Sequence, residues 1–362
     1  MSAVLISSEK ISTQLTGADA YRVHYRSKDV QGKPTESTGL VIAPSAAGEN
    51  RKVLSWAHGT TGMGDASCPS AQPDPARDLT LYFVAGSTTQ IDYGIPGAQR
   101  FIDEGWVITA TDYQGIGTSG PHQYTVNRTN GLDALNIVHA AREMNVGAGT
   151  QVGMIGWSQG GGSVAAAAEL DAADYGDLTL VGIAAMSPGV VSIAIEQPGL
   201  GAALGSGAPL PPDSHLFMIL AAHVAAYPET LSLDDVFTPA GKNVYEKSWN
   251  TAPGHHLNDI LVRTSKHEGP VMSINKDKLP AWIAAMKDGS AAKVTPVCPV
   301  LVLIDKQDPD GPCPLPWQVG YIEAVKELGG QVESVEYPND DHFSLPHASI
   351  DTSREWLASK FH

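Results

Sequence analysis

Short, almost wholly apolar segments recur along the chain, separated by segments with helical spacing of apolar residues. The apolar segments are residues 53–57, 106–110, 151–157, 180–186 and 300–304. Strands covered by helices on both faces lose the alternation of polar and apolar positions and produce this pattern. Between them, residues 131–144 and 316–328 repeat apolar side chains at helical intervals. This order predicts an α/β protein with a mostly parallel, doubly wound sheet.

The two ends of the chain extend this predicted sheet. Residues 21–43 contain two strand-like segments joined through a Gly-Lys-Pro turn, which predicts an antiparallel pair at the start. Residues 331–337 predict a last strand, and a helix follows it near the C-terminus.

One long interval interrupts the alternation of strands and helices. Residues 190–295 contain no clear parallel strand, but they hold amphipathic pieces such as 215–227 and 279–288. A stretch of this length inside a compact domain is too long for a loop. We expect a helical cap over the carboxyl edge of the sheet, inserted into a core formed by residues 1–189 and 296–362; open α/β folds bind ligands at that edge. The alternative is that the interval only adds packing.

Charge and hydropathy exclude several classes of partner. The formal net charge of the 362 residues is −16, and such a surface repels nucleic acid and anionic headgroups. No apolar segment approaches the roughly 20 residues of a membrane-spanning helix. We therefore expect neither nucleic acid as a partner nor an integral membrane segment. The sequence does not indicate the oligomeric state.

Cysteine usage and the N-terminus bear on the cellular compartment. The three cysteines, Cys68, Cys298 and Cys313, have no paired short spacing, which argues against a zinc site and a dense disulfide framework but allows one bridge. The first residues have neither a basic start nor a sustained apolar stretch, so no signal peptide is visible. This favours a cytoplasmic location, with secretion as the alternative if a signal has been trimmed. We expect no metal ion and no organic cofactor.

The strongest chemical signal is Gly-Trp-Ser-Gln-Gly at residues 156–160. It follows an apolar strand and leads directly into a helical segment, and in that context G-x-S-x-G predicts a nucleophile elbow with Ser158 at its tip. Glycines on either side leave space for the tight reversal. A Gly-rich strand–helix turn could instead hold a phosphate group, but this one lacks the lysine and threonine of such loops.

A serine nucleophile needs a base that takes its proton. His342 follows the predicted last strand, and the loop after that strand ends at the same edge of the sheet as the elbow. His347 is the alternative. Other histidines, His223, His255 and His256, have no acid or cysteine at metal spacing and are interpreted as packing or surface residues.

The acid that orients the imidazole should follow the strand at 300–304. Three carboxylates lie there, Asp305, Asp308 and Asp310. Asp305 is still at the strand end and Asp310 lies deeper in the turn, so Asp308 is the preferred candidate. The preceding strand at 180–186 ends without an acid, which removes the other usual location.

An oxyanion hole requires backbone amides that face the elbow. One donor is predicted to be the amide of Gln159, directly after the nucleophile. The other should come from the His-Gly-Thr-Thr-Gly loop at residues 58–62, with Thr60 and Thr61 as candidates. A plain Gly-rich loop is the alternative interpretation of that segment.

The combination of several segments resembles the secretory-lipase branch of the α/β hydrolases, the lipase A-like enzymes. These segments are HGTTG with the following Cys-Pro-Ser at 68–70, TDYQGIGTSGPHQY at 111–124, and GWSQGG at 156–161. The resemblance implies an α/β-hydrolase fold with a helical cap before the acid-bearing strand, and Ser158, Asp308 and His342 as the triad. Many members carry export signals and a disulfide that would involve Cys68, and some have an aspartate where this chain has Thr61.

Together these features predict a serine carboxylic ester hydrolase, an esterase or lipase, that acts on a small-molecule ester. Trp157 and Tyr113 are candidates for the substrate pocket, although Tyr113 could instead cap the core. The alternatives are another acyl-transfer enzyme on the same scaffold (an amidase, peptidase, acyltransferase or perhydrolase) and a non-catalytic receptor of the same fold.

Overall fold

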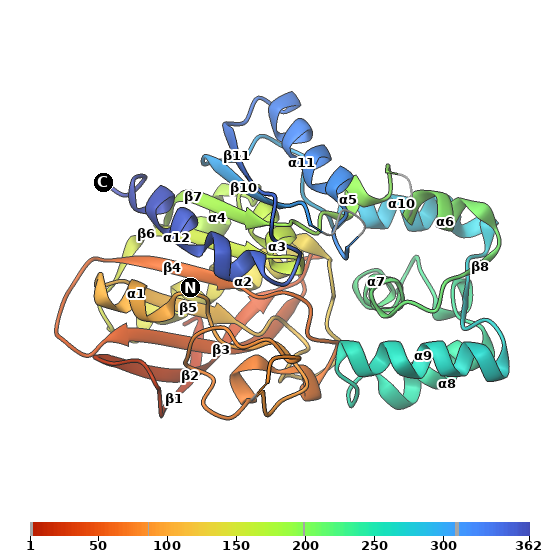
Figure 1. Cartoon of the computed structure of the whole chain (residues 1–362), viewed down its shortest axis with the longest axis horizontal. Helices are drawn as coiled ribbons and strands as arrows, with labels where there is room; N and C mark the ends of the chain where they lie inside the picture. Colours follow the sequence, from red (N-terminus) through yellow and green to blue (C-terminus); the bar gives the residue numbers. More distant parts are fainter. Residues whose placement is uncertain (1–2, 86, 198–199, 308–310) are drawn as a thin grey trace.

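A single large sheet organises the chain. The computed structural model describes residues 3–85, 87–197, 200–307 and 311–362. Within these residues a nine-stranded sheet has the order β1-β2-β3-β5-β4-β6-β7-β10-β11 (Figure 1). Its strands are β1 (Leu5–Ile11), β2 (Ala18–Lys28), β3 (Pro34–Pro44), β4 (Arg51–Ala57), β5 (Val107–Thr111), β6 (Ala148–Trp157), β7 (Thr179–Met186), β10 (Val300–Asp305) and β11 (Val332–Tyr337). The pairs from β1 to β5 are antiparallel and those from β5 to β11 are parallel.

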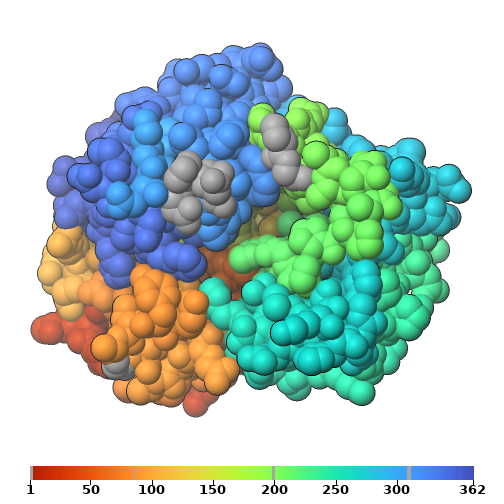
Figure 2. All heavy atoms as spheres, turned by 45° about the vertical axis from the view of Figure 1, so that its right-hand side comes forward, coloured from red at the N-terminus to blue at the C-terminus, as the bar shows by residue number. Residues whose placement is uncertain are grey.

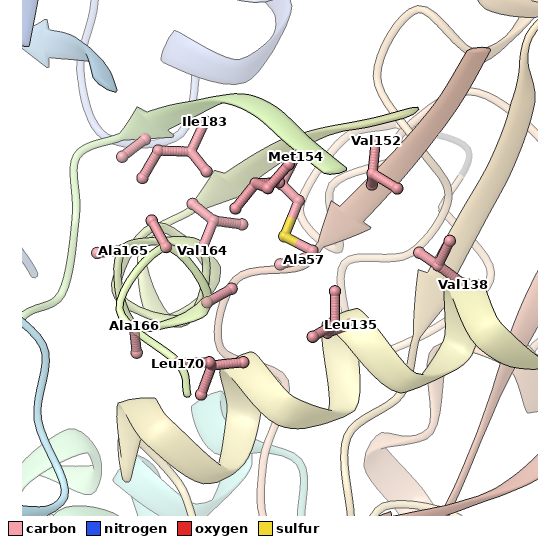
Figure 3. Close-up of a cluster of buried hydrophobic side chains, with 14 of the residues drawn as sticks. Ala57, Leu135, Val138, Val152, Met154, Val164, Ala165, Ala166, Leu170 and Ile183 are labelled. Atoms are coloured by element: carbon pink, nitrogen blue, oxygen red, sulfur yellow. The ribbon is translucent and has the colours of Figure 1, made fainter. Parts of the chain in front are cut away.

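The parallel strands are buried on both faces, as their apolar sequences predicted. In β10, Val300 and Val302 pack into one apolar cluster, whereas Leu301 and Leu303 pack into another on the opposite face. Figure 3 shows part of the first cluster, where Val164 and Leu135 project from helices toward strand residues such as Met154. The predicted α/β fold with a mostly parallel sheet is confirmed, and helices cover both of its faces.

Six helices accompany the sheet. They are α1 (Ala98–Asp103), α2 (Asn127–Glu143), α3 (Gln159–Ala167), α4 (Ala172–Tyr175), α11 (Leu315–Glu327) and α12 (Leu345–Ala358), all counted among the described residues. Helices α2, α3 and α11 contribute to the cluster of Figure 3, and α1 and α12 to the cluster on the other face. The short 3-10 turns η1 (Asp65–Ser67) and η2 (Pro69–Ala71) lie between β4 and α1.

Two details differ from the sequence expectation. Strand β1 was not predicted, because its residues show no apolar alternation and most are exposed; pairing of its backbone with β2 keeps it extended. Helix α2 begins one turn earlier than the apolar period indicated. Its polar first turn is buried, since Asn127 donates to the carbonyl of Gly189 at 3.0 Å and Asn130 donates to the carbonyl of Gln123 at 3.1 Å.

Between β7 and β10 the chain forms helices at one end of the sheet (Figure 1). The elements are α5 (Val191–Ala194), α6 (Leu200–Ser206), β8 (Pro209–Leu210), α7 (Ser214–Ala226), η3 (Leu233–Asp235), α8 (Pro239–Ser248), α9 (Gly254–Glu268), β9 (Met272–Ser273), η4 (Lys276–Lys278) and α10 (Leu279–Asp288). They share an apolar cluster that includes Phe217, Leu257 and Trp282, together with Met63 and Tyr124 from outside this interval. Helices α5–α10 are called the cap helices below.

Two further findings concern cysteines and membranes. All three cysteines are buried and free, so the bridge that the resemblance implied for Cys68 is absent from the described structure. Among the residues described, no helix has both the length and the apolar character needed to cross a bilayer.

Candidate active site

Ser158 occupies a sharp turn between β6 and α3. Its φ of 58° lies in the left-handed region, which a non-glycine residue rarely adopts. Hydrogen bonds on both sides hold the turn: the Ser158 amide donates to the carbonyl of Met186 at 2.9 Å, and the Ser158 carbonyl accepts from the amide of Gly189 at 2.8 Å. The backbone strain is therefore maintained by β7 and the segment after it.

The glycines of the motif are required by close backbone contacts. A Cβ atom on Gly156 would lie 2.1 Å from the carbonyl oxygen of Gly160. A Cβ atom on Gly160 would lie 1.9 Å from the carbonyl oxygen of Ala57, at the end of β4. The elbow thus packs against the neighbouring strand more closely than any residue with a side chain allows.

His342 reaches the same site from near the end of the chain. It lies between β11 and α12, and its side chain is almost fully buried. The indole N–H of Trp157 donates to the carbonyl of His342 at 2.8 Å, which connects the loop of His342 to the residue before Ser158. Ser158 and His342 line one small cavity. The alternative base, His347, is exposed on α12 and does not line that cavity.

The environment keeps the imidazole of His342 neutral. Burial is the main cause that lowers the pKa of His342 to about 3, and the nearby His215 lowers it further. The carboxylate of Asp341 acts in the opposite direction and raises this pKa. Its Nδ1 atom has no hydrogen-bond partner among the described residues. A neutral imidazole can accept a proton from a serine hydroxyl.

The preferred acid, Asp308, lies outside the described residues, as does Asp310. Asp305 is the buried last residue of β10, where its Oδ1 accepts from the hydroxyl of Ser187 and from Nε2 of Gln318, the latter at 2.8 Å. The amides of the next two residues, 306 and 307, donate to the carbonyl of Asp340 at 3.2 and 3.0 Å. The loop after β10 is thereby attached to the loop that carries His342.

The candidate oxyanion donors surround the elbow. Gln159 is the first residue of α3, and Thr60 lines the same small cavity as Ser158. The Thr60 hydroxyl lies 2.7 Å from the hydroxyl of Tyr124. Thr61 is buried, and its carbonyl accepts from the amide of Gly254 at 2.8 Å, so the 58–62 loop also contacts the start of cap helix α9.

The two candidate pocket residues take different positions. Trp157 lines the small cavity. Tyr113 is fully buried at a φ of 67°, and its hydroxyl donates to the carbonyl of His58 at 2.9 Å. Tyr113 therefore contacts the 58–62 loop and lines neither this cavity nor the larger one next to it.

A larger, mostly apolar cavity of about 520 Å³ also reaches Ser158. Most of its wall comes from residues to which the sequence analysis gave no role in a site: Tyr124, Val190, Val191, Ala194, Leu200, Ala203, Leu216, Ile219, Cys313 and Trp317. Cys313 lies next to Ser158, with 3.9 Å between its sulfur and the Ser158 hydroxyl. Burial raises the pKa of this thiol to about 12, so it is uncharged at neutral pH.

Cap residues complete the site. Figure 2 shows the surface hollowed where the cap helices, the segment around residues 60–90 and the C-terminal segments meet. His215 of α7 lines both cavities, and His255 of α9 lines the smaller one and stacks on Tyr82 with ring centres 3.8 Å apart. His223, in contrast, is buried within α7 and pairs with the carbonyl of Ile219.

Sequence reasoning missed His215 and did not place His255 in the site, because only the packing of the cap on the core brings them to Ser158. No signal in the sequence marks them. Tyr124, however, lies inside the 111–124 motif that the sequence analysis did single out. Among the described residues, no group of three or more His, Cys, Asp or Glu side chains could hold a metal ion.

Comparisons with known proteins agree with this geometry. A family model described as secretory lipase matches residues 81–194, a segment that includes the elbow. The rice cell wall degrading esterase LipA from Xanthomonas oryzae superposes with a TM-score of 0.73 at 18% identity, covering 100% of both chains. Candida antarctica lipase A in its closed state superposes with a TM-score of 0.74 at 15% identity, covering 99% of this chain and 82% of the other. No curated protein matches the sequence.

The fold and the elbow define an α/β hydrolase. With the family match over residues 81–194, the expected resemblance to secretory lipases is confirmed, and the match favours a carboxylic ester hydrolase. The expectation of a cytoplasmic location finds no support in this match.

Proposed function

We propose that the protein hydrolyses carboxylic esters through an acyl-enzyme intermediate on Ser158. The observation that carries the proposal is the convergence of Ser158, held at positive φ, and the neutral, buried His342 on one cavity. The hydroxyl of Ser158 and the imidazole of His342 lie 184 residues apart in the sequence, so only the fold brings them to the same cavity.

In the first half-reaction the Ser158 oxygen attacks the ester carbonyl carbon while His342 accepts the hydroxyl proton. The carbonyl oxygen becomes an oxyanion, which the amides of Gln159 and of Thr60 or Thr61 stabilise. The C–O bond to the alcohol then breaks, and the imidazolium of His342 protonates the departing oxygen. Water, deprotonated by the same imidazole, attacks the acyl carbon and releases the acid and free Ser158.

Asp308 is proposed as the acid of the triad. Residues 306 and 307, which directly precede Asp308 in the chain, bond to the carbonyl of Asp340, two residues before His342. Asp305 is a weaker candidate because Ser187 and Gln318 already engage its carboxylate at the strand end. An aspartate beside His342 would stabilise the imidazolium of the transition state.

The larger cavity is proposed to hold the acyl chain. It starts at Ser158 and Gln159 and continues between aliphatic cap residues such as Val191, Leu216 and Ile219. Its volume lies within the range of roughly 300–1,000 Å³ for small-molecule sites. Acyl groups longer than acetyl would bury apolar surface there, at about 0.8 kcal/mol per methylene.

Residues 190–295 are proposed to act as a lid domain on a core of residues 1–189 and 296–362. Cap helix α7 supplies walls to both cavities, so access to Ser158 depends on where this helix lies. The description of the matched family as secretory favours a secreted protein.

The test is hydrolysis of p-nitrophenyl butyrate by the wild type and by three variants. Ser158→Ala and His342→Ala should fold normally and lose nearly all turnover, and Asp308→Asn should lose about 10⁴-fold in kcat, as removal of a triad acid does elsewhere. Wild-type Ser158 should be labelled by a fluorophosphonate. An alanine variant at 158 that keeps most of its activity would refute the proposal, and a matched amide hydrolysed as fast as the ester would assign the site to amide chemistry.

A further inference from the structure

A short segment on the core side of the site contacts both halves of the proposed oxyanion hole. Residues 121–125 connect the loop after β5 to α2, and His122 and Tyr124 within them are buried. The amide of His122 donates to the carbonyl of Met63 at 3.0 Å, which anchors the segment to the end of the 58–62 loop. Neither side chain has a part in the proposed reaction steps.

His122 holds the side chain of Gln159. Its Nδ1 lies 2.8 Å from the carbonyl oxygen of Gln114, which can only accept, so Nδ1 carries the hydrogen. Burial lowers the pKa of His122 to about 3, so the ring is neutral and Nε2 is left with a lone pair. The Nε2 of Gln159 lies 2.6 Å from that atom and 3.3 Å from Oδ1 of Asn130, and its two hydrogens match these two acceptors.

Tyr124 holds Thr60, the residue that carries the other proposed oxyanion donor. Its hydroxyl lies 2.7 Å from that of Thr60; Tyr124 is buried, and Thr60 is half-buried. The ring of Tyr124 packs edge-on to the ring of His122, which also stacks on the ring of Tyr113. Within three residues, the chain therefore fixes Gln159 on one side and Thr60 on the other.

We infer that His122 and Tyr124 are positioning residues that set the separation and direction of the two oxyanion donors. The inference rests on the proposed function, because it assigns the amides of Gln159 and Thr60 to the oxyanion. A side chain locked by buried hydrogen bonds restricts the backbone that carries it, and donors that are fixed in advance need no reorganisation when the oxyanion forms. Loss of either contact should weaken binding of the transition state and leave binding of the ester unchanged.

The experiment compares His122→Leu and Tyr124→Phe with matched controls. Tyr175→Phe removes a buried tyrosine hydroxyl that donates to the carbonyl of Ala167, and His223→Leu removes a buried histidine with the same Nδ1–carbonyl contact as His122; neither control residue lines the site. His122→Gln offers an oxygen acceptor near the position of Nε2 and tests rescue. All rates are normalised to the number of serines that a fluorophosphonate labels at completion, which removes differences in folded fraction.

With p-nitrophenyl acetate, whose acyl group is too short to fill the apolar cavity, each test variant should lower kcat about tenfold and leave KM within twofold. Affinity for a trifluoromethyl ketone, which forms an oxyanion adduct with the serine, should fall by the same factor, and His122→Gln should recover most of the loss. Unchanged kcat per labelled serine, or equal losses in the controls, would overturn the inference. Failure of the wild-type serine to label would instead refute the proposed function.

Discussion

Replacement of Gly160 by alanine tests whether the close packing of the elbow controls catalysis. The added Cβ would lie 1.9 Å from the carbonyl oxygen and 2.4 Å from the carbonyl carbon of Ala57, and both are backbone atoms of β4. Side-chain carbons essentially never approach within 3.0 Å, so α3 and β4 must separate by about 1 Å. A displacement of this size at a reacting group reduces the rate about 10²-fold. Overpacking of a filled interior also destabilises by about 1–3 kcal/mol.

The assay is hydrolysis of p-nitrophenyl butyrate per labelled serine, together with the thermal midpoint. Gly205→Ala in α6 is the matched control, because a Cβ there meets nothing within 4 Å and alanine favours a helix over glycine. We expect Gly160→Ala to lose at least about 100-fold in kcat/KM and Gly205→Ala to keep wild-type activity. A Gly160→Ala enzyme within threefold of the wild type would show that the elbow tolerates this displacement, and the geometric argument for Ser158 would fail.

Two further predictions concern stability and chain-length preference. Burial raises the pKa of Asp133 to about 7, so the folded state holds this proton more tightly than the unfolded state, and stability should fall by up to about 4 kcal/mol as the pH rises from 4 through 7. Asp133→Asn should remove this pH dependence. The free energy of unfolding, measured by urea unfolding at pH 5 and pH 8, should therefore change less between the two pH values in the variant than in the wild type. An equal change in both proteins would contradict the prediction. Ala194 lines the apolar cavity, so Ala194→Phe should lower kcat/KM for p-nitrophenyl decanoate at least about tenfold while acetate hydrolysis stays within threefold. Equal losses on the two esters would mean that the acyl chain lies elsewhere.

The site shows which kinds of residue a sequence can identify. The position of Ser158 on a tight turn was predictable because a strand, a G-x-S-x-G turn and a helix follow one another within a few residues, and local backbone geometry alone selects the glycines. That His342 lies near Ser158 was predictable because the carboxyl ends of parallel strands share one edge of the sheet. The walls of the apolar cavity, such as Leu216 and Trp317, were not, since an aliphatic residue on an amphipathic helix has the same pattern whether it faces a core or a cavity.

Asp305 illustrates the limit for charged residues. In sequence it is one of three neighbouring carboxylates after a buried strand, and spacing alone cannot tell which one turns toward the histidine. The structure shows its carboxylate engaged by Ser187, from the adjacent strand end, and by Gln318, from α11. Such partners depend on which strands are neighbours.

The sequence by itself determined the α/β architecture, the order in which the predicted strands and helices follow one another, and the turn between strand and helix at Ser158. These features follow from periodicity and backbone conformation, which act over short stretches. Only the tertiary structure decided that β1 extends the sheet and that the cysteines stay unpaired. It also decided that Tyr113 contacts the 58–62 loop, that His122 contacts Gln159 and that Tyr124 contacts Thr60. Each of these depends on contacts between residues far apart in the chain, whose distances are set when the helices pack on the sheet.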